Sequence, residues 1–437
     1  MVSLARLTLR PTEISANRSL FLLTVAHAFN HAQAALLPLV YLVIIRDFHV
    51  TVPQIAFLTA AGSLVSGMVQ LGYSGITRRV SRRSILGWGN VMFGGFQALM
   101  GLTTSFIPFS IANVASKVGG SQQHPVGNGL LAEQFAPDRR GFAISAHIAG
   151  GNVGSAVVPL IGTWLIAGVG WQWTLVLFGV PPILIGLGML AWIRESGADR
   201  AAAIASGSVR SSLRTVLRDR DLLLTYVSSA LGGGARGLGV LNLFVPLYLS
   251  LVLGIDDATV GLMLTVLLAG SVPGPLIAGW LSDRFGRRPL IVLVYAGGAL
   301  SLVLFVLAGH DLGLLWIAIL LLSAFNFVES PQLQALLADI SRPAIRDTSF
   351  AVYFTLAFGI GSLWTALYGA VIDASGNAQG LPIVFWLMAG AFVGAALTVL
   401  PIRAEQRTAE VHAEELALGE AAAASDVAKT TFRDPLA

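Results

Sequence analysis

The sequence predicts an all-α integral membrane protein of twelve transmembrane helices, arranged as two six-helix halves. Composition is the first observation: 55% of the 437 residues are hydrophobic and 11% are charged, whereas soluble domains have about 25% charged residues. An internal repeat is the second, because Pro125 and Arg140 recur 206 positions later as Pro331 and Arg346. Tandem halves of this kind are one architecture of secondary transporters, whose substrate site lies near the bilayer midplane between the halves.

Twelve apolar stretches are long enough to cross a hydrocarbon core of about 30 Å as helices. They cover residues 19–45, 53–77, 84–104, 106–135, 141–168, 171–193, 222–253, 257–281, 289–308, 312–340, 347–373 and 380–401. The expected organisation is a cytoplasmic lead-in at 1–18, a first half at 19–193, a cytoplasmic linker at 194–221, a second half at 222–401 and a cytoplasmic tail at 402–437.

The arginines predict the orientation. Seventeen of them fall in the five internal loops on one side, and a single one, Arg46, falls in the loops of the other side. Because an excess of Lys and Arg marks the cytoplasmic side, we expect a multi-pass protein of the cytoplasmic (inner) membrane with both termini in the cytoplasm. The net charge of +4 follows this topology, so we expect no nucleic-acid partner.

One loop and two acid–arginine pairs carry a family resemblance. The loop after the eighth span reads Gly279-Trp-Leu-Ser-Asp283-Arg284-Phe-Gly286-Arg287-Arg288, and the fourth and tenth spans end in the pairs Glu133 with Arg140 and Asp339 with Arg346. This pattern resembles the Gly-x-x-x-Asp-Arg-x-Gly-Arg-Arg loop and gate networks of the major facilitator superfamily. The resemblance implies the major facilitator fold, a cytoplasmic gate made by these residues, and glycines that let the helices pack closely.

Within that superfamily the chain resembles the fosmidomycin-resistance-type efflux proteins. The likeness lies in Gly119-Gly-Ser-Gln-Gln-His124-Pro125 of the fourth span and Gly150-Gly-Asn152-Val-Gly154-Ser155 of the fifth. Gly141, Gly150 and Gly154 also have the spacing of a glycine motif associated with drug antiporters, with Ser155 where that motif has proline. The likeness implies proton-driven export of a drug or toxic compound.

Polar side chains inside the predicted spans mark a cavity or pathway, because each costs several kcal/mol in lipid. They are His27, Asn30, His31, Lys117, His124, Asn128, His147, Arg236, Asn326 and Glu329. All but His147 lie on the first and fourth spans of each half, which the resemblance implies line the central cavity. At about 1.5 Å per residue, the charged residues and His31 and His124 lie about 14–24 Å from the cytoplasmic end of their helices, near the midplane.

We expect Lys117 and Arg236 to bind an anionic substrate, with further contacts from Asn30, His31, His124, Asn128 and Asn326. The alternative is that these cations form structural ion pairs. Glu329 is the carboxylate nearest the midplane and is our first candidate for carrying the coupling proton. His27, His31 and His124 compete with it. Glu329 as a permanent partner of Arg236 or Lys117 is the other possibility left open.

Enzyme chemistry is not expected. The chain has no cysteine, and the glycine run before Arg236 lacks the Gly-Lys-Ser/Thr end of a phosphate loop. His27 and His31 stand at i, i+4, but zinc needs three or four ligands, so we expect no metal and no cofactor. An integral membrane hydrolase remains a remote alternative.

The sequence thus predicts a proton-coupled secondary active transporter that works as a monomer in the bilayer. Its partners would be protons and a small anionic or amphiphilic substrate, which it exports as a drug or toxic compound antiporter. The alternative is a proton symporter that imports an organic anion, namely a carboxylate, phosphate or phosphonate. The same residues would serve either direction.

Overall fold

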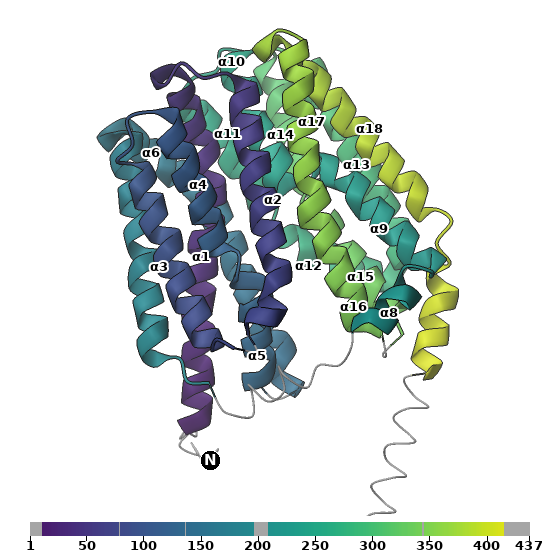
Figure 1. Ribbon diagram of the computed structural model, residues 1–437. Coiled ribbons are helices and arrows are strands. Elements are labelled where there is room, and N and C mark those ends of the chain that lie inside the picture. The colour runs from purple at the N-terminus through teal and green to yellow at the C-terminus, as the bar shows by residue number, and fades with distance from the viewer. Residues whose placement is uncertain (1–10, 78, 136, 196–208, 343–344, 415–437) are drawn as a thin grey trace, which may run out of the picture.

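The computed structural model describes residues 11–77, 79–135, 137–195, 209–342 and 345–414. Every regular element in these ranges is a helix, and the long helices run side by side (Figure 1). The first half of the chain forms one group of helices and the second half forms the other. This confirms the predicted all-α fold.

The first half contains a continuous first helix and an interrupted fourth one. Its elements are α1 (Pro11–Asp47), α2 (Val52–Ile76), α3 (Arg82–Met100), α4 (Phe106–Gly120), the π-helical turn η1 (Gln123–Gly127), α5 (Asn128–Gln134) and α6 (Pro137–Trp192). The stretch α6 holds two predicted spans. They are separated by a kink at Gly170, whose φ of 80° favours glycine, and this kink falls between the predicted ends at 168 and 171.

The second half has more interruptions. Its elements are α8 (Val209–Val216), α9 (Arg220–Gly232), η2 (Gly233–Ala235), η3 (Gly237–Leu241), α10 (Asn242–Leu251), α11 (Asp257–Ala269), α12 (Pro273–Phe285), α13 (Arg287–Ala308), α14 (Leu312–Phe325), α15 (Glu329–Ile340), α16 (Arg346–Thr355), η5 (Leu356–Ile360), α17 (Gly361–Ala374), η6 (Asn377–Gly380) and α18 (Leu381–Val399). Each predicted span coincides with one helix or a run of helices. The helix α8 lies inside the segment that was predicted only as a linker.

Length and surface fit a membrane protein. Within the described residues, eight helices are long and apolar enough to cross a membrane by length and composition. Large apolar side chains face outward, among them Trp164 and Leu276, each 75% exposed. An apolar surface of this kind is typical of a membrane protein, because lipid tails are as apolar as the side chains that face them.

The two halves meet at the ends of the helices that lie away from the arginine-rich loops. There α2 packs beside α17, and α6 beside α11 (Figure 1). Arg46 forms a salt bridge of 3.1 Å with Asp257 across the two halves. The backbone amide of Val52 also donates to Asn377 Oδ1 over 3.1 Å. These contacts join the two halves on that side.

The opposite end contains part of the predicted gate. Arg287 Nε lies 2.9 Å from Asp339 Oδ2, which ties the start of α13 to α15. Arg284 lies over the Trp280 ring, 5.8 Å from its centroid. Arg288 Nη1 donates to the carbonyl of Ile402 over 3.3 Å.

The rest of the predicted gate lies outside what the structure describes. This applies to the side chains of Glu133, Arg140, Asp283 and Arg346. The implied close packing at Gly279 is wrong for this conformation, because a Cβ added there would meet nothing within 4 Å. Gly286 is needed instead for its backbone, since it turns the chain between α12 and α13 with a φ of 92°.

Candidate functional site

Three of the four predicted cavity-lining helices are interrupted at the depth of their polar residues. The fourth span passes through the π-helical η1, which contains His124 and Pro125. The seventh leaves the helical conformation at Arg236 (φ −62°, ψ 136°). The tenth breaks between the end of α14 and the start of α15 at Glu329. Such breaks free backbone groups from helical hydrogen bonds, and in membrane transporters they mark substrate sites.

Arg236 and Glu329 form a buried ion pair across two of these breaks. Arg236 Nε donates to Glu329 Oε1, and its Nη2 donates to the carbonyl and hydroxyl oxygens of Ser229, each over 3.2 Å. The Glu329 side chain is fully buried, whereas that of Arg236 is 17% exposed. Glu329 Oε2 has no hydrogen-bond partner. The structure therefore selects Arg236, not Lys117, as the partner of Glu329.

Asn326 holds the break that positions Arg236. Its Nδ2 donates to the carbonyl of Ala235 over 3.1 Å, and its own carbonyl accepts from the Gly237 amide over 2.9 Å. These bonds flank Arg236 on both sides and replace the helical bonds lost there. Asn326, predicted to bind substrate, thus has its amide nitrogen engaged in the scaffold, while its buried Oδ1 has no partner.

Lys117 lies on α4 and reaches α2. Its Nζ donates to the Thr59 carbonyl over 3.3 Å and to Ser63 Oγ over 3.5 Å. None of the salt bridges among the described residues involves Lys117. A half-buried ammonium held only by neutral oxygens leaves a positive charge that an anion can neutralise.

Four histidines gather in the first half. The centroid of the His27 ring lies 4.5 Å from that of His31, 4.8 Å from that of His124 and 4.3 Å from that of His147. His27 Nδ1 donates to the His147 carbonyl over 2.9 Å. His31 Nδ1 and Ser155 Oγ are 3.2 Å apart. The sequence placed His147 apart from the other three, and that separation is wrong, because its ring stacks on His27.

Glycines of α6 bring this cluster together. A Cβ added at Gly154 would collide with the carbonyl oxygen of Ala28 on α1, and one at Gly150 would lie 2.8 Å from the carbonyl oxygen of Thr24. Two of the three glycines of the predicted motif therefore let α6 lie directly against α1. The surroundings of Gly141 lie outside the described residues. This close approach sets Ser155 beside His31.

The remaining predicted residues lie nearby. Asn30 Nδ2 donates to the Gly120 carbonyl over 3.3 Å, which links α1 to the end of α4. Asn128 Oδ1, at the start of α5, is buried and has no hydrogen-bond partner. Both asparagines are thus on the helices expected to line the cavity, and Asn128 offers a buried polar atom without a partner.

Sequence reasoning missed residues that bind the site together. Asn152 on α6 donates to the Ser271 carbonyl over 2.9 Å and so crosses between the halves. Ser229, which accepts two hydrogen bonds from Arg236, precedes it by seven residues, two helical turns. That spacing was a usable signal for Ser229. Nothing local in the sequence points to the partner of Asn152.

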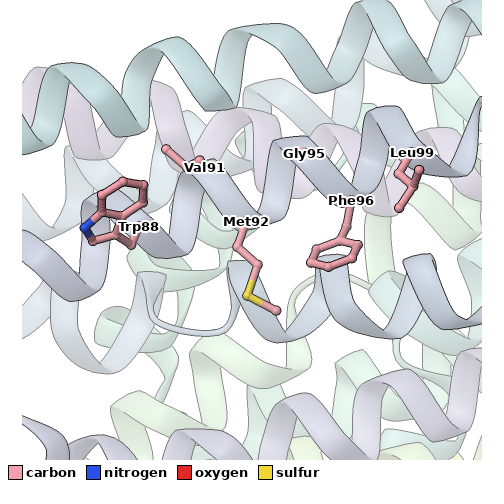
Figure 2. A pocket seen from close by; sticks show the side chains of 6 residues that line it. All are labelled: Trp88, Val91, Met92, Gly95, Phe96 and Leu99. Carbon is pink, nitrogen blue, oxygen red and sulfur yellow. The ribbon is translucent and has the colours of Figure 1, made fainter.

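A separate pocket runs along α3 and is lined by Trp88, Val91, Met92, Gly95, Phe96 and Leu99 (Figure 2). Its lining is apolar, and Trp88 is 61% exposed. These residues follow one face of a single helix at helical spacing. In a membrane protein such a face suits a lipid chain, so this pocket is not the candidate transport site.

The fold and the buried ionic site together define a polytopic membrane transporter. The sequence model of the Major Facilitator Superfamily matches residues 21–248 and again 236–437, so the chain belongs to this superfamily. The two matches agree with the two halves seen in the structure. The superfamily is one of transporters, which agrees with the expected class of protein.

Relatives and a solved structure show what the chain is similar to. It is 26% identical to the cis,cis-muconate transport protein of Acinetobacter baylyi, over 70% of this chain and 75% of that protein. It is 25% identical to the gallate transporter of Pseudomonas putida, over 78% and 83%. A bacterial homolog of the human lysosomal transporter Spinster, inward-facing and unoccupied, superposes with a TM-score of 0.68 at 16% identity, covering 92% of this chain and 98% of that one.

Proposed function

We propose that the protein is a proton-coupled carrier that imports a small organic anion, with a carboxylate as the preferred charged group. One observation carries this proposal: the buried Arg236–Glu329 pair lies at the breaks of two helices that are predicted to line the cavity. Similarity to transporters named for muconate and gallate, both carboxylates, supports the substrate class.

The ion pair suggests how proton and anion are coupled. While Glu329 is ionised, it neutralises Arg236 and competes with any other anion for that guanidinium. Protonation of Glu329 releases Arg236, and a substrate carboxylate then replaces Glu329 as its partner. Breaking a buried pair without such a replacement would leave an uncompensated charge, at about 3–5 kcal/mol. One proton and one anion therefore bind together, as they do in a symporter.

Lys117 supplies the second contact in this proposal. It belongs to the first half, whereas Arg236 belongs to the second, and its ammonium is held only by oxygens of Thr59 and Ser63. An anion that engages both cations would favour closure of the halves around it. Arg287 and Asp339 would then open and close with the cytoplasmic side.

The predicted exporter is the second candidate. It keeps one structural argument, because Gly150 and Gly154 make the close α1–α6 contact at the spacing of the antiporter glycine motif. The two relatives reported above are named for metabolite transport, and they give the drug-efflux specificity and the fosmidomycin-resistance likeness no support. The symporter and the exporter differ in whether the proton and the substrate move in the same direction or in opposite directions.

The test is transport of labelled cis,cis-muconate and gallate in proteoliposomes. A symporter accumulates the anion when the outside is more acidic than the inside, and the accumulation collapses when a protonophore is added. An antiporter accumulates it under the opposite gradient. Uptake of neither anion under either gradient would overturn the proposed substrate class.

We also infer the membrane topology from the loop charges: inner membrane, both termini cytoplasmic, with six-helix halves at 19–193 and 222–401 joined by 194–221. Because the chain contains no cysteine, single cysteines placed in each loop report sidedness directly. Labelling of a cysteine at Arg46 by an impermeant reagent from the cytoplasmic side would contradict this orientation.

We also expect the protein to be a monomer. The molar mass of the purified protein in detergent, without the mass of the bound detergent, tests this.

A further inference from the structure

We propose that His27, His31 and His124 form a binding site for a divalent transition-metal ion such as Zn²⁺. One ring nitrogen of each residue can be chosen so that all three lie within 4.8 Å of one another. The first two come from α1, and the third comes from η1, the interrupted part of the fourth span. This inference is independent of the proposed anion transport.

In the sequence only two ligands, His27 and His31, stand at a suitable spacing, and for that reason we expected no metal. The structure supplies the third one through tertiary packing, since His124 lies on a different helix. Glu329, the carboxylate predicted nearest the midplane, is bound to Arg236 in the other half. Among the described residues the cluster consists of imidazoles, and an imidazole donor set suits Zn²⁺, Ni²⁺ and Cu²⁺ and not the oxygen-seeking Mg²⁺ or Ca²⁺.

Hydrogen bonding presents His27 as a metal ligand. The His147 carbonyl can only accept, so His27 Nδ1 carries the proton in their 2.9 Å bond. In the neutral ring, Nε2 then bears the free electron pair, and this atom is buried without a hydrogen-bond partner. An N–H donated to a backbone carbonyl is the arrangement that orients metal-binding histidines in general.

His31 has a comparable support. Its Nδ1 is 3.2 Å from the Ser155 hydroxyl, which leaves Nε2 to face other partners. Ser155 stands where the antiporter glycine motif has proline, and proline offers no hydroxyl. The chain thus departs from that motif at the residue that fixes this ring.

The cluster is slightly wider than a metal-bound one. Nitrogens at Zn–N distances of about 2.0–2.1 Å in a tetrahedral site are about 3.3 Å apart, so each nitrogen has to move inward by less than about 1 Å. Gly151 leaves room for this movement, because a Cβ there would lie 3.0 Å from His27 Nδ1 and 3.1 Å from His31 Cδ2. The His31 and His124 rings are partly exposed, which leaves a fourth position for water or an anion.

Co²⁺ is a suitable probe because its visible absorption reports coordination number and ligand type. The full-length protein is purified in detergent with a tag free of histidine. His49, His310 and His412 are exposed, and a background variant with all three replaced by glutamine removes adventitious sites. The absence of cysteine excludes thiolate ligands. We expect one Co²⁺ per chain, with a four-coordinate spectrum that Zn²⁺ abolishes.

Variants in this background assign the ligands. His31→Gln and His124→Gln should each weaken Co²⁺ binding at least tenfold, and Ser155→Ala should weaken it less, because it removes only a supporting hydrogen bond. Zn²⁺ should raise the melting temperature of the background protein but not that of His31→Gln. Ser155→Ala keeps the test decisive if a histidine variant fails to fold.

Two results would overturn the proposal. One is the absence of stoichiometric Co²⁺ binding to the background variant. The other is binding of equal affinity in His31→Gln, His124→Gln and Ser155→Ala, which would mean that the metal sits elsewhere. In either case the cluster would be a hydrogen-bonded set of neutral histidines, and its candidacy for proton transfer would be the remaining explanation.

Discussion

Replacing Glu329 by glutamine is the most direct test of the coupling mechanism. The substitution keeps the shape of the side chain and removes the charge that neutralises Arg236. Breaking a buried ion pair from one side costs about 3–5 kcal/mol. Arg236 is 17% exposed and keeps its two hydrogen bonds to Ser229. We therefore expect the free energy of unfolding to fall by an amount near the lower end of this range, about 3 kcal/mol.

The transport phenotype follows from what glutamine imitates. Glu329→Gln resembles the protonated carboxyl group, so Arg236 is permanently released and available to a substrate anion. The variant should therefore bind substrate and exchange labelled for unlabelled substrate across the membrane. It should not accumulate substrate under a proton gradient, because no proton leaves or enters at residue 329 during the cycle.

The assay compares accumulation with exchange in the same proteoliposomes. Asp311→Asn is the matched control: Asp311 caps α14 by accepting from the Leu314 amide over 3.0 Å, and asparagine caps helices as well as aspartate does. This control should retain both activities. If Glu329→Gln still concentrates substrate against its gradient, the proton is carried elsewhere, and His31 and His124 become the candidates.

Three further predictions test the substrate site, the helix packing and the gate. Lys117→Ala should weaken binding of an anionic substrate at least tenfold, about 1.4 kcal/mol, and an unchanged calorimetric affinity would exclude Lys117 from the site. Gly154→Ala should lower the melting temperature, because its Cβ collides with α1, whereas Gly168→Ala, which meets nothing within 4 Å, should not. Arg287→Ala removes the partner of Asp339 and should speed labelling of a cysteine placed on the cytoplasmic side. Unchanged labelling and turnover would show that this pair is no gate.

The sequence predicted the helices well and their interruptions poorly. Hydrophobic length places a span to within a few residues, because a helix must cover the hydrocarbon core. It carries no information on where the backbone leaves the helical hydrogen-bond pattern. Pro125 and the glycines around Arg236 were present as signals, yet proline and glycine occur in unbroken membrane helices too, since neighbouring groups satisfy the freed backbone. The π-helical form of η1 was therefore not predictable from the sequence.

The distance of each residue from the cytoplasmic end of its helix predicted which residues lie at the level of the site. Which of them are in contact depends on how the helices pack. Arg236 and Glu329 were placed near the same level, and the structure pairs them. Lys117 was placed near that level too, but it turns toward α2. The position of His147 was misjudged because helix membership, used to judge it, ignores that α6 lies directly against α1. Contacts between helices depend on how each helix is rotated about its own axis. The spacing of residues in the sequence predicts only which residues are neighbours on the same helix.

Charge balance connects the two clusters to the number of protons transported. With Glu329 ionised, Arg236 is neutralised and Lys117 contributes one positive charge to the empty site. A singly charged carboxylate that binds with one proton on Glu329 leaves that total unchanged, so closure around the loaded site and around the empty site buries the same net charge. A doubly charged substrate would lower the total by one unit. The proposed mechanism then requires a second proton, and in the metal-free protein His31 and His124 are partly exposed titratable groups of the first half that could receive it.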